Sequence, residues 1–327
     1  MASSTQARGA NRKLVRLIAG RIGAAVITLF LVSLIVFAIS DLLPGDAAQE
    51  ALGQSATPAQ VAALRHEMGL DRPSYLRFGS WIVGLAGGDA GTSLVANMPV
   101  GDIIAERLPN SLILAALTTL VAVPLALLIG ISSAMNRGGR LDRALNVVTL
   151  SMVALPEFLV ATLAVLIFSV KLRWLPSISM LPEKASWGQL FENFAMPVFA
   201  LCVVVIAQMA RMTRAAVIDQ LDRPYVEMAL LKGLSRPRIV IAHVLPNAVG
   251  PIVNAMALSL SYLLGGAIIV ETIFNYPGLA SLMVNAVTSR DMPLLQACAM
   301  IFCSVYLLLM LVADVTAILA NPRLRNA

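Results

Sequence analysis

Few side chains in this chain of 327 residues have the types and spacing needed for catalysis. The only two histidines, His66 and His243, fall in separate polar stretches, so a shared zinc site is not expected. The sequence contains no GxxxxGK[ST] phosphate loop, no HExxH and no GxSxG. It therefore predicts no ATP hydrolysis by this chain, no catalytic residue, no metal site and no cofactor.

The three cysteines, Cys202, Cys298 and Cys303, lie in apolar stretches and form no Cys-x-x-Cys pair. We expect them to be buried small hydrophobic side chains, without a metal or redox role.

Three acidic residues interrupt apolar runs. Glu157 follows Pro156 in the middle of such a run and is a candidate pathway residue, with a protonated or paired structural carboxyl as the alternative. Asp314 is expected to be a structural anchor, and Glu271 to mark a membrane boundary. Pro156 is expected to kink the helix that contains it.

The composition indicates where these side chains must sit. Hydrophobic residues make up 58% of the chain and charged residues only 13%, with a mean hydropathy of +0.83. Such a chain is not disordered, collagen-like, a disulfide-stapled secreted domain or an ordinary cytosolic enzyme. The net charge of +6 comes from basic residues that cluster at the ends of apolar runs, which favours a role in membrane topology over binding of nucleic acid.

The apolar runs predict an all-α polytopic membrane protein with six transmembrane helices. The runs cover residues 22–40, 109–136, 144–170, 193–210, 244–270 and 292–313. The first is longer than the apolar part of a signal peptide and is interpreted as a retained helix. Six spans put both termini on one side, and the basic residues of the N-terminus, 137–143, 211–238 and 323–325 make that side cytoplasmic.

Three regions follow from this topology. Residues 1–108 comprise a cytoplasmic N-terminus, the first span and a periplasmic loop. Residues 109–320 form a five-helix permease core with a cytoplasmic loop at 211–248, and residues 321–327 form a cytoplasmic tail. Within the periplasmic loop, Thr57 is expected to cap a short helix that begins at Pro58 and stops at Gly69.

The cytoplasmic loop contains the most informative pattern. Residues 227–231 favour a helix that Gly233 stops, and residues 239–243 form a second short apolar piece that ends at Leu245 and Pro246. This hairpin cannot hide the apolar side chains of Met228, Leu231 and Leu234 by itself. We expect it to dock on a partner or on the base of the bundle, with a self-packed loop as the alternative.

The spacing of these residues resembles the EAA loop of permeases of ATP-binding-cassette importers. That motif has Glu-Ala-Ala, a glycine six residues after the glutamate, and Leu-Pro twelve and thirteen residues after the glycine. This chain has Glu227, Ala229, Gly233, Leu245 and Pro246 at those places. Met228 departs from the middle alanine, and His243 is typical of the dipeptide/oligopeptide (and nickel) branch.

Further segments resemble the same branch, in order, over roughly residues 15–325. They are GLDRP at 69–73, GDAGTS at 88–93, GGA at 265–267, ETIFNYPG at 271–278, RDMP at 290–293, Asp314, and NPR at 321–323, where Asn321 replaces a usual aspartate.

The resemblance implies the type I fold of such importers and a multi-pass subunit of a bacterial inner membrane. It implies two separate ATP-binding subunits, a second permease subunit, with a paralogue favoured over a copy, and a periplasmic or lipid-anchored solute-binding protein. It implies di- or oligopeptides as substrate. The residues implied to couple to the ATPases are Tyr225, Glu227, Ala229, Lys232, Gly233, His243, Leu245 and Pro246.

Other functions stay open at this point. The same architecture imports nickel, oligosaccharides or opine-like solutes in relatives of this branch. An ion-coupled secondary transporter would show pathway charges in several spans, which are sparse here. A purely structural membrane scaffold would not need the hairpin.

Overall fold

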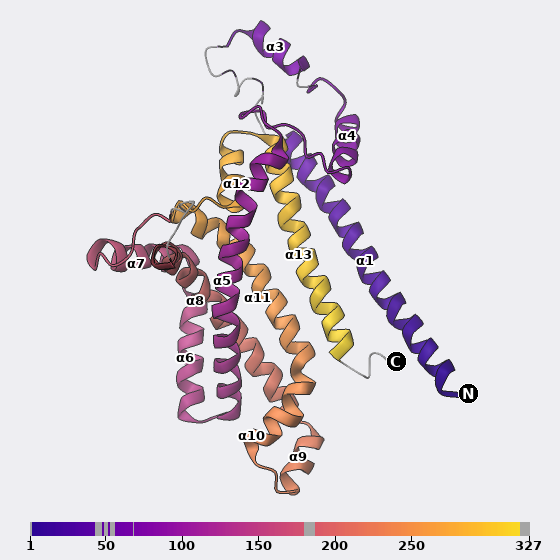
Figure 1. Cartoon of the computed structure of the whole chain (residues 1–327), viewed down its shortest axis with the longest axis vertical. Coiled ribbons are helices and arrows are strands. Elements are labelled where there is room, and N and C mark those ends of the chain that lie inside the picture. Colours follow the sequence, from indigo (N-terminus) through magenta and orange to yellow (C-terminus); the bar gives the residue numbers. More distant parts are fainter. Residues whose placement is uncertain are drawn as a thin grey trace. The chain divides into compact units, whose positions relative to one another are not determined.

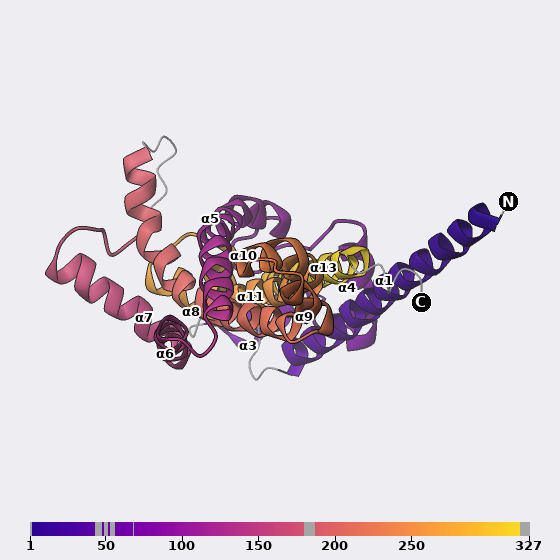
Figure 2. The same cartoon turned by 90° about the horizontal axis from the view of Figure 1, so that it is seen from below.

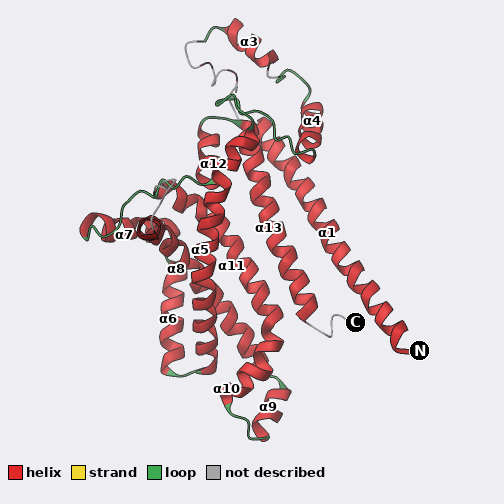
Figure 3. Cartoon of the chain, viewed as in Figure 1, coloured by secondary structure: helices red, strands yellow, loops and turns green. Residues whose placement is uncertain are grey.

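The computed structural model describes residues 2–42, 48, 52, 56–67, 69–179 and 187–320. The predicted tail 321–327 lies outside these residues. Figure 3 shows that the described chain is built of helices and loops. Within it the only β pairing is an isolated bridge between Thr92 and Pro99, which confirms the all-α prediction.

Five helical stretches in the described chain are long and apolar enough to cross a membrane, or six if a bent pair counts as one span. They are Leu17–Ser40 in α1 (Ala2–Leu42), Val100–Met135 (α5), Gly188–Leu221 in α8 (Trp187–Leu221), Arg236–Ile273, and Met292–Ile318 in α13 (Met292–Ala320). These agree with five of the six predicted runs.

The remaining predicted run, 144–170, is not one helix. It is divided into α6 (Arg140–Ala154) and α7 (Glu157–Ala164), which continues as a π-helical stretch, η1 (Val165–Lys171). The two parts are bent by 96°, and Figures 1 and 2 show α7 lying across the axis of α6. The break confirms the kink predicted at Pro156, because a residue before proline avoids the helical region and Leu155 is extended, with ψ 125°.

The chain divides into two units. The first contains residues 1–25, 114–274 and 306–327, and α8 is its centre: α6, α7 and α11 (Leu245–Ile273) all pack against it. Gly130 lets the backbones of α5 and α8 approach each other closely, since a Cβ at this position would lie 2.6 Å from the carbonyl oxygen of Ala210 in α8. This is the packing role expected of a small residue between membrane helices.

The second unit contains residues 26–113 and 275–305. It holds α3 (Pro58–Glu67), α4 (Ser74–Ala86) and α12 (Leu279–Thr288). The prediction for α3 is confirmed: the Gln60 side chain accepts a hydrogen bond from the Thr57 backbone N–H at 2.9 Å, and Gly69 has φ +65°.

Buried polar contacts in this second unit join segments that are far apart in the sequence. Asp291 is buried, accepts a hydrogen bond from the Ser93 hydroxyl, and accepts another from the Leu94 N–H at 3.2 Å. The Tyr276 hydroxyl donates to the Asn110 carbonyl oxygen at 2.7 Å. The motif segments 88–93, 275–278 and 290–293 therefore have a structural role within this unit.

Between α8 and α11 the chain forms α9 (Pro224–Leu231) and α10 (Arg236–Ile239), followed by a π-helical stretch, η2 (Val240–Val244). One part of the prediction is wrong here. The second apolar piece does not end at Leu245 and Pro246 but runs on through η2 into α11. Pro246 lies in the first turn of α11, where its nitrogen needs no hydrogen-bond partner. Figure 1 shows α9 and α10 beyond the adjoining ends of α8 and α11.

Candidate functional site

The α9–α10 hairpin, residues 224–239, is fixed to the first unit by one face. Val226 and Ala229 of α9 and Ile239 of α10 are buried in a cluster to which α5, α8, η2 and α11 also contribute. Leu234 packs against this cluster, which agrees with the expectation that apolar side chains of the hairpin dock on the base of the bundle. A short helix is marginal alone in water, and this shared core is what holds α9 in place.

The opposite face of α9 is apolar and uncovered. Met228 is 56% exposed and Leu231 is 77% exposed, and their helical spacing turns both away from the buried Val226 and Ala229. Leu230, 48% exposed, lies at the side of the helix. Such exposed apolar side chains on one short helix are of the kind that marks an interaction site. The prediction that Met228 and Leu231 are not hidden by the hairpin itself is confirmed.

Gly233 makes the turn between the two helices. Its φ is +79°, a left-handed conformation that other residues rarely adopt, and an added Cβ would meet nothing within 4 Å. Its N–H donates to the Leu230 carbonyl oxygen at 2.9 Å, and the Leu234 N–H donates to the Ala229 carbonyl oxygen at 3.2 Å. The glycine is therefore required by backbone conformation and not by space.

The other residues predicted to couple to ATPases surround the apolar patch. Glu227, Lys232, His243 and Pro246 are exposed, whereas Ala229 is buried and Leu245 is half-buried. Among the described residues, no hydrogen bond or ion pair holds Glu227 within the loop. Partial burial raises the pKa of Tyr225, so its hydroxyl keeps its proton and donates to the Gln220 side chain at 3.2 Å.

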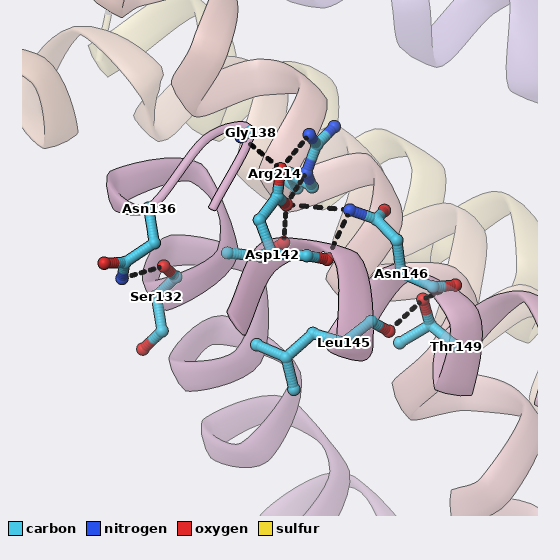
Figure 4. A network of polar contacts seen from close by, with 9 residues as sticks. Ser132, Asn136, Gly138, Asp142, Leu145, Asn146, Thr149 and Arg214 are labelled. Carbon is cyan, nitrogen blue, oxygen red and sulfur yellow. Dashed lines mark hydrogen bonds and ion pairs between the residues drawn. The ribbon is translucent and has the colours of Figure 1, made fainter. Parts of the chain in front are cut away.

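An ion pair with a buried carboxylate joins α6 to α8 (Figure 4). The Arg214 guanidinium donates to both oxygens of Asp142, at 2.8 and 2.9 Å. The Asp142 side chain is 5% exposed and that of Arg214 is 26% exposed. Asp142 also accepts hydrogen bonds from the Ser133 hydroxyl at 2.5 Å and the Gly138 N–H at 2.9 Å.

These contacts fix three helices to one another, because Ser133 lies in α5, Asp142 in the first turn of α6 and Arg214 in α8. We call this set of residues the Asp142 clamp. A second pair, Arg137 with Asp222 at 2.8 Å, joins the α5–α6 turn to the end of α8 but is exposed on both sides. Sequence reasoning missed the clamp, since Asp142 stands between Arg140 and Arg143 like an ordinary acidic residue at a helix start.

Glu157 lies in the first turn of α7, directly after the break, and is half-buried. Its carboxylate lies against Gly266 of α11: a Cβ on Gly266 would be 2.7 Å from Oε2 and 2.9 Å from Oε1. Asp314, by contrast, pairs with Arg21 at 3.1 Å, which confirms its predicted anchoring role. Glu271 is fully buried and is therefore not simply a surface marker.

Comparison with known proteins identifies the family of this chain. Residues 126–326 match the family described as "Binding-protein-dependent transport system inner membrane component", and residues 14–115 match the N-terminal family of such membrane components. The chain is 37% identical over 298 residues to the protein named glutathione transport system permease protein GsiC of Escherichia coli K12, covering 91% of this chain and 95% of that protein. It has the same identity and coverage with GsiC of Salmonella choleraesuis strain SC-B67.

Among solved structures, an inward-facing form of the MetNI methionine ABC transporter covers 68% of this chain and 94% of that chain, with 16% identity and a TM-score of 0.48. The family matches together span nearly the whole sequence and include the hairpin, the clamp and Glu157. They also exclude the ion-coupled secondary transporter that the sequence left open. The chain belongs to the family of inner membrane components of binding-protein-dependent transport systems.

Proposed function

We propose that this chain is one permease subunit of an ATP-driven importer of peptides, and that separate ATPase subunits hold it by the α9–α10 hairpin. The observation that carries this proposal is the two-sided character of α9. One face is fixed in a core shared with α8 and α11, and the other presents Met228 and Leu231 to the outside. A helix of this kind can transmit force from a groove in a partner to the helices that it joins.

The remaining residues have defined places in this proposal. Tyr225, Glu227, Lys232, His243 and Pro246 border the contact, Gly233 sets the turn, and Ala229 and Leu245 form the base on which it rests. The Glu227 carboxylate is then available to a basic group of the partner. The contact lies in the cytoplasmic loop 211–248 of the permease core 109–320.

The topology supports this assignment. Arg223, Lys232, Arg236 and Arg238 are exposed on or beside the hairpin, and such residues favour the cytoplasmic side. Both termini would then be cytoplasmic. The pathway would lie between this chain and a second permease subunit, a paralogue, and a periplasmic or lipid-anchored binding protein would deliver the solute from the other side of the bacterial inner membrane.

The substrate class rests on the relatives. Proteins 37% identical to this chain are named glutathione transport permeases, and glutathione is a small peptide. No described feature of this chain favours nickel, oligosaccharides or opine-like solutes over peptides. We therefore propose di- or oligopeptides.

Two glycines offer a matched test. Gly233 and Gly88 both have a left-handed backbone, with φ +79° and +86°, and open space around an added Cβ, but Gly88 lies between α4 and α5 in the second unit, outside the hairpin and the clamp. We expect Gly233→Ala to reduce uptake of labelled peptide strongly at normal membrane levels, because the turn that orients α9 is strained by about 1–2 kcal/mol. Gly88→Ala carries a similar strain and should leave most uptake intact.

Leu231→Asp tests the contact directly. We expect the variant to insert normally but to lose the ATPase subunits during purification, since a charge would enter an apolar contact. Recovery of wild-type amounts of ATPase with this variant, or equal uptake by the two glycine variants, would contradict the proposed role of the hairpin.

A further inference from the structure

We infer that Glu157 is the group in this subunit that binds the ammonium of the transported peptide. This inference rests on the proposed function and names the chemistry by which the pathway would recognise its substrate. Glu157 begins the apolar helix α7, directly after the break between α6 and α7.

The first argument is that the carboxylate has no counter-ion. Among the described residues, no hydrogen bond or ion pair reaches Glu157, whereas Asp142 and Asp314 each face an arginine. An acidic side chain within a membrane is costly, and such residues usually face a cavity or a functional partner. A cationic ligand at this carboxylate would remove that cost, and the α-ammonium of a peptide is such a cation.

The second argument is that α11 makes room for the carboxylate. Gly266 has no side chain, and a Cβ added there would lie only 2.7 Å from Oε2 and 2.9 Å from Oε1 of Glu157. The carboxylate therefore occupies the space that a larger residue at this position would need. Gly266 is buried, while its neighbour Gly265 is exposed and meets nothing within 4 Å. The absence of a side chain at Gly266 therefore leaves room for the carboxylate, whereas Gly265 makes no such contact.

The third argument is the character of the adjoining face of α11. Asn254, Tyr262 and Thr272 are exposed and recur at spacings that place them on one side of this helix. Tyr262, one turn before Gly266, is 58% exposed. Polar side chains on the surface of an apolar span fit a water-filled pathway better than lipid.

Gly266 lies seven residues before the end of α11, which corresponds to about 10 Å of helix. In the proposed orientation this end faces the binding protein, so Glu157 would meet the solute early.

The test uses the complete permease–ATPase assembly in proteoliposomes with a saturating amount of its binding protein. The probes are labelled trialanine and glutathione, and their N-acetylated forms, and the readout is peptide imported per ATP hydrolysed. We expect Glu157→Gln to lower this ratio for the free peptides about tenfold, the effect of losing one charge-assisted hydrogen bond. Glu157→Asp, which keeps the charge, should retain most import.

Matched glycine variants separate position from charge. Gly266→Ala should lower import of the free peptides as Glu157→Gln does, because the new methyl displaces the carboxylate, and Gly265→Ala should import them like the wild type. Glu157→Gln and the wild type should import each acetylated peptide equally, because these lack the ammonium.

The outcomes are distinct. If the wild type imports the free peptides and Glu157→Gln does so equally well, or if Asp and Gln at this position are equally defective, the inference is wrong while the proposed function stands. If Glu157→Gln lowers import of free and acetylated peptides equally, the inference is also wrong, because Glu157 would then have a structural role only. If the wild-type assembly imports no peptide, the proposed peptide specificity fails, and the ammonium site fails with it.

Discussion

The Asp142 clamp should be a major source of stability in the first unit, and the exposed pair Arg137–Asp222 provides its control. Arg214→Met keeps most of the apolar stem but removes the guanidinium that pairs with both oxygens of Asp142. Removal of one partner from a buried pair costs about 3–5 kcal/mol, because the other charge stays buried without compensation. Asp142 retains the Ser133 hydroxyl and the Gly138 N–H, so we expect the lower end, about 3 kcal/mol.

The control is Arg137→Met. Arg137 and Asp222 approach to 2.8 Å, as closely as the buried pair, but their side chains are 54% and 60% exposed. A pair in contact with solvent contributes about 0–1 kcal/mol. The two substitutions remove the same chemical group at the same distance from a carboxylate, and they differ mainly in burial.

The assay is reversible unfolding of the purified subunit in mixed micelles with increasing fractions of SDS, followed by tryptophan fluorescence. A double-mutant cycle with Asp142→Asn isolates the interaction, for which we expect a coupling energy of about 2 kcal/mol. Equal destabilisation by Arg214→Met and Arg137→Met would refute the reasoning, because burial would then not determine the contribution of these pairs.

Three further predictions concern packing, a buried hydrogen bond and the break. Gly130→Ala should destabilise the fold by about 1–3 kcal/mol, because its Cβ would meet the Ala210 carbonyl oxygen at 2.6 Å. Gly101→Ala in the same helix, where an added Cβ meets nothing within 4 Å, should be neutral or stabilising in the same unfolding assay. Tyr276→Phe should cost about 1–2 kcal/mol because it removes the hydrogen bond of a buried hydroxyl and leaves the half-buried Asn110 carbonyl without its donor. Tyr306→Phe, at a more exposed tyrosine, should cost less than about 0.5 kcal/mol. Pro156→Ala should slow amide exchange of residues 155–159 and lower peptide uptake, since the restored N–H favours a continuous helix; unchanged exchange would show that packing alone sets the bend.

The sequence was sufficient for the features that depend on local chemistry. Long apolar runs predict membrane spans because the backbone must satisfy its own hydrogen bonds in lipid, and five of these runs are continuous helices in the structure. Pro156, Thr57 and Gly233 each act through their own backbone, so the break, the helix cap and the turn could be located in advance.

The sequence was not sufficient for contacts that depend on how helices pack. Asp142 and Arg214 are 72 positions apart, and nothing near either residue shows that they meet. Gly266 looked like an ordinary packing glycine, and its relation to Glu157 appears only when α7 folds back against α11. The continuation of the second apolar piece into α11 was missed because Pro246 is compatible with either a helix end or a helix start.

The clamp and the break lie at opposite ends of α6. This arrangement determines which helices would move when α9 is displaced. Asp142, in the first turn of α6, is bonded to α8, and α8 leads into α9 through only two residues, so these helices must move together. At the other end, Leu155 and Pro156 interrupt the helical hydrogen bonds, and that joint costs least to bend. A displacement of the hairpin would therefore bend the chain at Leu155 and Pro156, beside Glu157, whose carboxylate contacts Gly266. If the chain has the proposed function, a weakened clamp should reduce the peptide imported per ATP even in a variant that still folds and still binds the ATPase subunits.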